Sequence, residues 1–162
     1  MISRRLHGRL LVERAIMIKT YPYFGFYKSD NIAYVRGWYR STAGNNYHLK
    51  LIFSDYYPDR IPELYLLSPK TLWKYCLVGT INQLEASHQF HTLSSDFDDH
   101  IQLCHYGSEK WHAACTSIGV MTRGLLWIEA YEDHLKTGED INTIINQWKR
   151  RKQWEETLNV NE

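Results

Sequence analysis

The chain has few cysteines and an almost balanced charge, and each scarcity excludes a class of protein. Three cysteines in 162 residues are too few, and odd in number, for a disulfide framework, and they fit a reducing cytoplasm. The formal net charge is only +1, so the basic surplus that nucleic-acid binding usually needs is missing. No run of about 18 apolar residues occurs. We therefore expect a cytoplasmic protein with neither a nucleic-acid nor a membrane partner.

Motifs of the common enzyme chemistries are also missing. The chain has no glycine-rich phosphate loop, no Ser-His-Asp order and no paired glycosidase carboxylates, and its isolated glycines are typical of strands and turns. It also has no internal repeat, low-complexity tract or linker. A length of 162 residues suffices for one domain with a real core but not for two large ones. A single domain over residues 1–162 is therefore predicted.

Hydrophobic residues make up 44% of the chain and aromatic residues 14%, enough for a buried sheet. Their spacing predicts a helix over residues 3–19 and a longer one from Thr116 to about Gly138. Runs rich in β-branched and aromatic residues predict four strands between them. These runs are residues 24–27, 32–39, 47–53 and 63–67. Asp140 could cap a last helix over residues 141–158. This order predicts an α+β domain with a four-stranded antiparallel meander and C-terminal helices.

One cysteine lies between the predicted strands and the long helix. Residues 101–104 read Ile-Gln-Leu-Cys, and Trp111 follows Cys104 at a short distance along the chain. The thiolate is the reactive form of cysteine, and a neighbouring cation lowers a thiol pKa. His100 and His105 could favour the thiolate when protonated, or relay a proton when neutral. By itself, Cys104 could equally be a buried structural residue, since free cysteine is often buried.

In their order, these features resemble the ubiquitin-conjugating enzymes. Residues 47–53, followed by Tyr-Tyr-Pro at 56–58 and Ile-Pro-Glu-Leu-Tyr at 61–65, are similar to that family's third strand, its YP turn and the start of its fourth strand. Residues 101–104 look like the segment that ends in the active-site cysteine. Trp111 looks like the tryptophan after it, a packing residue that shapes the following loop.

The prokaryotic branch of this family is the more similar one. Residues 126–138 read LWIEAYEDHLKTG, which resembles the W-x-x-x-Y-E…TG stretch of bacterial homologues. Those homologues occur in antiphage operons beside a cGAS-like nucleotidyltransferase (CBASS systems), and in operons that conjugate bacterial ubiquitin-like proteins. The resemblance covers about residues 4–138 and leaves residues 139–162 as a C-terminal helical extension. We expect a stand-alone protein without a fused activating-enzyme domain.

The resemblance implies a cysteine-dependent acyl transferase that uses no cofactor or metal. Cys104 would carry the C-terminal glycine of a protein partner as a thioester, and in the antiphage setting that partner is the nucleotidyltransferase. A bacterial ubiquitin-like protein is the alternative cargo. The family's HPN tripeptide, whose asparagine is associated with stabilising the oxyanion, is replaced here by residues 87–92, farther upstream. Its loss affects transfer to lysine more than thioester formation.

Three histidines complete the predicted catalytic set. His88 or His91 could take the place of the missing HPN histidine and orient the backbone near Cys104, or both could simply stabilise a loop. His100 is the third supporting residue. The nearby acidic residues are either solvated loop charges or groups that position an attacking lysine. They are Asp96, Asp98 and Asp99.

Two other classes of function stay open. Zinc takes four histidine or cysteine ligands, and His88, His91 and Cys104 with either His112 or Cys115 could supply them. Their spacing, however, matches no common zinc motif. The second class is a non-catalytic binding module, because conjugating-enzyme folds can lose their cysteine and serve as adaptors.

The remaining cysteines and a basic run are predicted to be structural. Cys115 reads as a core residue, and Cys76 as a core or half-buried one. Residues 149–152, Lys-Arg-Arg-Lys, are predicted to form a solvated face of the last helix.

Overall fold

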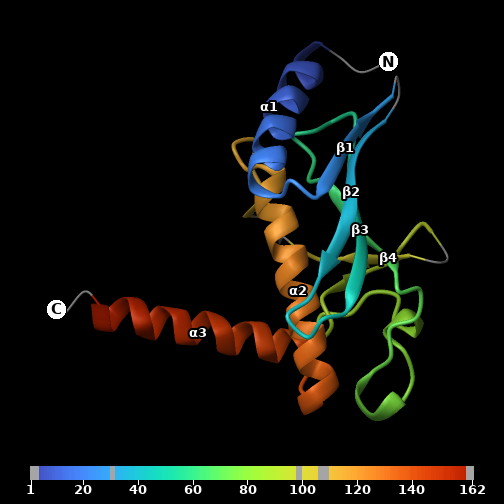
Figure 1. Cartoon of the computed structure of the whole chain (residues 1–162), viewed down its shortest axis with the longest axis vertical. Coiled ribbons are helices and arrows are strands. Elements are labelled where there is room, and N and C mark those ends of the chain that lie inside the picture. The colour runs from blue at the N-terminus through green and yellow to red at the C-terminus, as the bar shows by residue number, and fades with distance from the viewer. Residues whose placement is uncertain (1–3, 30–31, 98–99, 106–109, 160–162) are drawn as a thin grey trace.

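Helix α1 (Arg4–Thr20) opens the fold and is buried along one stripe. Leu6, Leu10 and Met17 are buried, at a spacing that places side chains on one helix face. Its extent agrees with the predicted helix, although Ala15 and Ile18, which the apolar spacing also places on the buried stripe, are exposed. The helix lies against the first strand (Figure 1). The computed structural model describes the residues 4–29, 32–97, 100–105 and 110–159.

Among the described residues, six antiparallel strands form one sheet, where four were predicted. They are β1 (Phe24–Lys28), β2 (Ala33–Arg40), β3 (Asn46–Phe53), β4 (Glu63–Ser68), β5 (Thr92–Leu93) and β6 (Ile101–Leu103). The spatial order is β1-β2-β3-β4-β6-β5, so the first four strands make the predicted meander. The strand count of four was wrong because β5 and β6 have only two and three residues, too few for a visible alternation.

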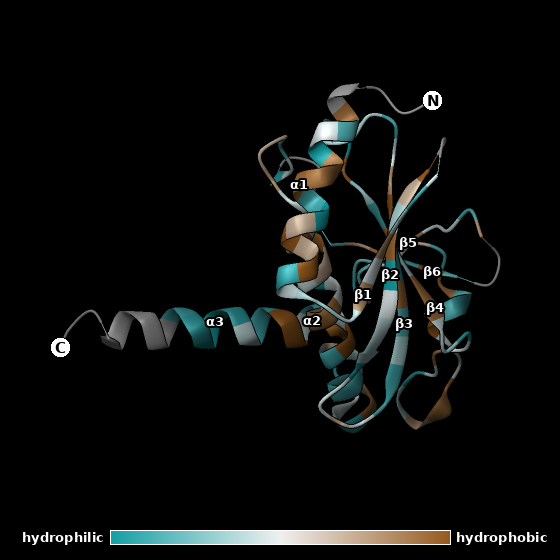
Figure 2. Cartoon of the chain, turned by 45° about the horizontal axis from the view of Figure 1, so that its top comes forward, coloured by the Kyte–Doolittle hydropathy of each residue, from teal (hydrophilic) through white to brown (hydrophobic). Residues whose placement is uncertain are grey.

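Two helices follow the sheet, as predicted. Helix α2 (Ser117–Thr137) crosses the sheet and ends at Gly138, whose φ of 79° is left-handed and suits glycine. Helix α3 (Ile141–Asn159) begins after Asp140, whose carboxylate accepts the N–H of Thr143 at 2.8 Å as an N-terminal cap. Figure 1 shows α3 leaving the body of the molecule, and Figure 2 shows an apolar base followed by a hydrophilic length.

The core lies between α2 and one face of the sheet. Strand β3 alternates as predicted, with Leu49 and Leu51 fully buried. A Cβ added at Gly124 of α2 would clash with Leu64 of β4, so the helix backbone sits close to the strand at this point. None of the helices in the described ranges combines the length and apolar character needed to cross a membrane.

Candidate functional site

Cys104 directly follows β6, the strand between β4 and β5. Leu103, the last residue of that strand, pairs with Leu64 on one side and with Thr92 on the other. The N–H of Cys104 donates to the carbonyl of His91 at 2.8 Å. The backbone of the cysteine is therefore fixed by the segment that leads into β5, while the residue stays partly exposed.

The surroundings of Cys104 do not favour its thiolate. Burial raises the pKa of the Cys104 thiol, because desolvation disfavours the charged form. Burial also lowers the pKa of His105 to about 4, with Arg123 adding to the shift and a backbone bond at Pro62 opposing it. His105 is therefore neutral at neutral pH and supplies no cation. Of the two roles left open for His105, the proton relay is the one that fits a neutral imidazole.

His91 connects the cysteine segment to α3. Its Nε2 lies 2.9 Å from Oδ1 of Asn142, and the N–H of Asn142 donates to the carbonyl of Gln89 at 2.8 Å. Burial lowers the pKa of His91 despite the opposing bond to Asn142, and the charges of His88 and Lys149 add to that shift. A neutral His91 must therefore donate from Nε2, since the amide oxygen only accepts.

Two of the three predicted histidines lie beside the cysteine segment. The rings of His88 and His91 are 5.8 Å apart, and His91 holds the backbone of Cys104. His88 is exposed, whereas His91 is half-buried and has a left-handed φ of 50°. Within the described part of the chain, no side chain hydrogen-bonds to the Cys104 thiol. His91 is therefore placed to hold the backbone of the cysteine through its own carbonyl, whereas His88 contacts His91.

His100 is not brought to the cysteine. It precedes β6, whereas Cys104 follows it, so about 13 Å of extended chain separate them. The ring of His100 lies 5.5 Å from that of Phe97 and 6.5 Å from that of Tyr65. It lines an open hollow of about 310 Å³. His100 thus belongs to the opposite end of the strand. Asp96 is exposed, whereas Asp98 and Asp99 lie outside the described residues.

Trp111 packs against the loop between β3 and β4. Its indole N–H donates to the carbonyl of Pro58 at 2.8 Å, and its ring lies 6.2 Å from that of Tyr57. This contact confirms that Trp111 is a packing residue, whereas the loop that it is predicted to shape includes residues 106–109, outside the described residues.

A buried carboxylate ties that loop to both helices. Glu13 of α1 is 0% exposed. Its Oε1 accepts from Arg9 at 2.8 Å and from the Tyr57 hydroxyl at 2.5 Å, and its Oε2 accepts from the backbone and hydroxyl of Ser117 at 2.9 and 2.6 Å. A negative charge at the first residue of α2 also suits the helix dipole. Glu13 was missed, although a charge on the apolar stripe of α1 was a visible signal.

The Trp-x-x-x-Tyr-Glu stretch of α2 is built into the core. The indole of Trp127 donates to the carbonyl of Phe90 at 2.7 Å, and the hydroxyl of Tyr131 donates to the carbonyl of Trp73 at 3.0 Å. The two rings stack with centroids 5.7 Å apart. Trp127 thus fixes the residue directly before His91, which extends the support of Cys104 to α2.

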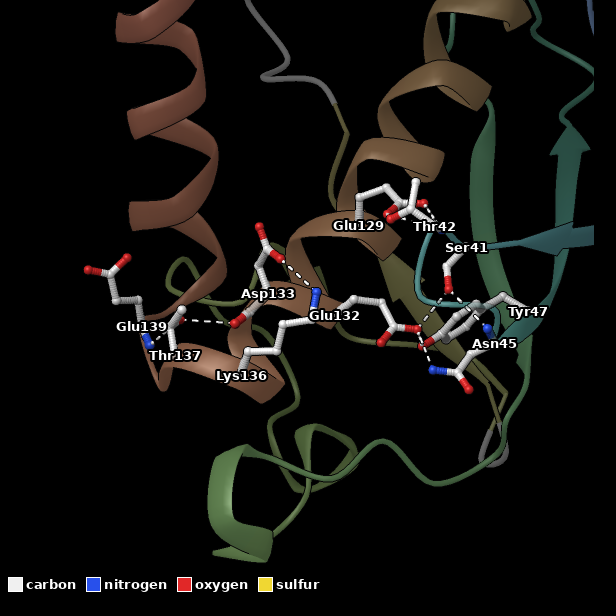
Figure 3. A network of polar contacts seen from close by, with 10 residues as sticks. All are labelled: Ser41, Thr42, Asn45, Tyr47, Glu129, Glu132, Asp133, Lys136, Thr137 and Glu139. Atoms are coloured by element: carbon white, nitrogen blue, oxygen red, sulfur yellow. Dashed lines mark hydrogen bonds and ion pairs between the residues drawn. The ribbon is translucent and has the colours of Figure 1, made fainter.

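The glutamate of this stretch anchors the β2–β3 turn. Oε1 of Glu132 accepts from the side chains of Ser41, Asn45 and Tyr47 at 2.9, 2.8 and 2.7 Å (Figure 3). One turn earlier, Glu129 accepts from the turn as well. Burial opposes ionisation of Glu129, but hydrogen bonds from the turn outweigh it and lower the pKa of this carboxyl. The two carboxylates thus fix the turn on α2.

The structure also bears on the zinc alternative and on the burial predicted for Cys115 and Cys76. Within the described ranges, no three histidine, cysteine, aspartate or glutamate residues come together as metal ligands would. Cys115 is partly exposed, and Cys76 is exposed in a short 3-10 turn. A core position for Cys115 and a core or half-buried one for Cys76 were therefore wrong, because adjacent aromatic or apolar residues do not bury a residue in a surface turn.

Alkylation of Cys104 should become faster as the pH rises, with a midpoint above the ordinary cysteine pKa. Only the thiolate reacts, and burial raises the pKa of this thiol. The rate can be measured by mass spectrometry of peptides after timed iodoacetamide treatment from neutral to alkaline pH. The exposed Cys76 in the same samples is the internal control. A midpoint below the ordinary value would contradict this prediction.

Cys104 is the strongest candidate for chemistry in the described chain. It combines partial exposure with a backbone fixed by β6 and His91. The base of α3 lies next to it through the bond between His91 and Asn142. Comparisons with family models, with curated proteins and with solved structures find no match for this chain.

Proposed function

We propose that the protein is a thioester carrier of the ubiquitin-conjugating type, with Cys104 as its nucleophile. The observation that carries the proposal is the position of Cys104 at the end of β6, with its N–H bonded to His91 and the residue partly exposed. The order of a helix, an antiparallel meander, this cysteine, Trp111 and α2 supports it. So does the resemblance drawn from the sequence.

The reaction is an acyl transfer to sulfur. The Cys104 thiol loses its proton to solvent, and the thiolate attacks the carbonyl of the partner's C-terminal glycine, which arrives as a thioester or adenylate. The new C–S bond forms as the bond to the leaving thiolate or AMP breaks. Water or an amine then takes the acyl group and releases the thiolate. The raised pKa of Cys104 fits a carrier that receives its acyl group from an activated donor, such as a thioester or an adenylate.

The segment in place of the HPN tripeptide serves as a positioning element. Three separate contacts hold it. His91 accepts from Cys104, Phe90 accepts from Trp127, and Gln89 accepts from Asn142. A backbone held at three consecutive residues keeps the cysteine at a fixed place beside the acyl group.

The partner follows from the resemblance to bacterial homologues. In an antiphage operon it is a cGAS-like nucleotidyltransferase, whose C-terminal glycine would be joined to Cys104. A bacterial ubiquitin-like protein is the alternative cargo, and the same chemistry serves both. Both alternatives place the protein in the cytoplasm.

Co-expression with the native operon neighbours tests the proposal. The tagged protein is purified and run on non-reducing and reducing gels, and shifted bands are identified by mass spectrometry. We expect an adduct that reducing agent removes, that Cys104→Ala abolishes and that the matched Cys76→Ala variant retains. Cys104→Ser should give an adduct that resists reducing agent, because an oxygen ester replaces the thioester. An adduct that forms with Cys104→Ala would overturn the proposal.

A further inference from the structure

Helix α3 begins beside the cysteine segment and then leaves the body. Ile141 and Ile144 of its first turn are buried in the core. Asn142 bonds to both Gln89 and His91, so the base of the helix is fixed next to the residue that holds Cys104. From Lys149 onward, the described side chains of α3 are exposed. The helix therefore runs from the candidate site out into solvent (Figure 1).

The face of α3 that begins at Asn142 becomes basic farther along. Residues seven apart lie about 20° apart around a helix, so Lys149 shares the face of Asn142. Asn146 lies between them on this face, and its amide donates to Asn142 at 3.3 Å. Lys149 is also close enough to His91 for its charge to lower the pKa of that imidazole, an effect that Asp140 at the base of the helix opposes. The site and this face thus form one continuous surface.

Positive charge is concentrated at the end of this surface. The exposed run consists of Lys149, Arg150, Arg151 and Lys152. Consecutive residues point about 100° apart, so the cations surround the helix. Among the side chains that the structure describes, which end at Gln153 in α3, no ion pair joins the first three to an acidic side chain. With four cations and the two glutamates Glu155 and Glu156, α3 has a net charge of +2 in a chain of net charge +1, and its basic run can attract negative charge.

We propose that the basic run of α3, which begins with Lys149 on the face of Asn142, binds an acidic segment of the partner's C-terminal tail, just upstream of the glycine that reaches Cys104. The inference rests on the proposed carrier function and adds a specificity to it. Charge complementarity identifies the occupant, because the cations of α3 attract a negatively charged segment and the base of this helix is bonded to the segment that holds Cys104. From Asn142 to Lys149 the helix rises about 10 Å, which an extended tail spans in about three residues. The acidic residues should therefore lie a few positions before the glycine.

A short peptide carrying an activated glycine tests this without any other enzyme. The probe is a peptide whose C-terminal glycine is a thioester of 2-mercaptoethanesulfonate. It is made in two versions: an acidic peptide with aspartates and glutamates before the glycine, and a neutral peptide with asparagines and glutamines at the same positions. The Cys104 thiolate attacks the glycyl carbonyl, the bond to the sulfonate thiol breaks, and the released thiolate takes up a proton from solvent. Intact-mass spectrometry measures the initial rate.

We expect the acidic peptide to react about tenfold faster than the neutral one at low ionic strength, since electrostatic steering can raise association rates by that order. Added salt should shrink the ratio, because it screens exposed charges. Lys149→Glu combined with Arg150→Glu should bring the ratio to one or below. The matched control, Arg14→Glu combined with Lys19→Glu on the exposed side of α1, reverses the same number of charges and should keep the wild-type ratio.

The outcomes separate the two proposals. Equal rates for both peptides, with an adduct that requires Cys104, would overturn the role of α3 and leave the carrier function intact. No Cys104 adduct with either peptide would overturn both. In a third outcome, the two peptides react at equal rates and a single-stranded oligonucleotide binds the wild-type protein but not the double variant. That outcome would show that α3 binds nucleic acid instead of the tail.

Discussion

Replacing Glu13 with alanine should lower the free energy of unfolding by about 3–5 kcal/mol, as breaking a buried ion pair typically does. The carboxylate is fully buried and accepts from Arg9, Tyr57 and Ser117. Its removal leaves the Arg9 guanidinium without its carboxylate and the Tyr57 hydroxyl without an acceptor, and unpaired buried donors are costly. The midpoint of thermal unfolding, followed by circular dichroism, should fall by about 10 °C.

Two variants show whether the carboxylate itself is responsible. Glu85→Ala removes a carboxylate from an exposed position and should change stability by less than about 0.5 kcal/mol. Tyr57→Phe removes one donor only, so its effect should shrink when Glu13 is already alanine. The double-mutant cycle measures that coupling. A Glu13→Ala protein as stable as Glu85→Ala would show that the network contributes nothing.

The outline of the fold was accessible from the sequence because its main elements are long and periodic. β3 has eight residues that alternate between buried and partly exposed, and α1 repeats its apolar residues at helical spacing. Gly138 and Asp140 mark the end of α2 and the start of α3 by local backbone chemistry. Each of these signals lies within a few residues of the feature it specifies.

The pairing around Cys104 was not accessible in the same way. β5 and β6 have only two and three residues, too few for a period of their own, and they join the sheet through the pairing of β6 with β4 and of β5 with β6. The bond between His91 and Asn142 joins residues 51 apart in the chain. No propensity or spacing predicts such a contact, because it depends on how the whole chain folds. Cys104 itself is proposed as the nucleophile only on an ordered set of motifs spread over the chain.

Some misjudged positions had a local signal of a different kind. Glu13 lies on the apolar stripe of α1 between Leu10 and Met17, where a charged residue needs buried partners. Cys76 was placed among aromatic residues, yet its φ of 55° puts it in a surface turn. The identity of a neighbour in sequence thus says less about burial than the periodicity of the element that carries it.

Replacing Glu132 with alanine should cost about 2–4 kcal/mol of unfolding free energy, on the basis of about 1–3 kcal/mol per unsatisfied buried donor after partial relaxation. One oxygen of this buried side chain accepts from Ser41, Asn45 and Tyr47. The Tyr47 hydroxyl is deep enough that burial, together with its bond to Glu132, raises its pKa and keeps it a donor. Urea unfolding at neutral pH measures the loss.

Glu132→Gln separates the acceptor from the charge. The side chains of Ser41, Asn45 and Tyr47 all donate hydrogen bonds to Oε1, and within the described chain no partner hydrogen-bonds to Oε2. A glutamine can therefore keep its carbonyl oxygen where Oε1 lies and turn its amide nitrogen to the side of Oε2. If hydrogen bonding to one oxygen fixes the β2–β3 turn, Glu132→Gln should lose less than half of what Glu132→Ala loses. Equal losses would show instead that the negative charge holds the turn, through its field on the three donors.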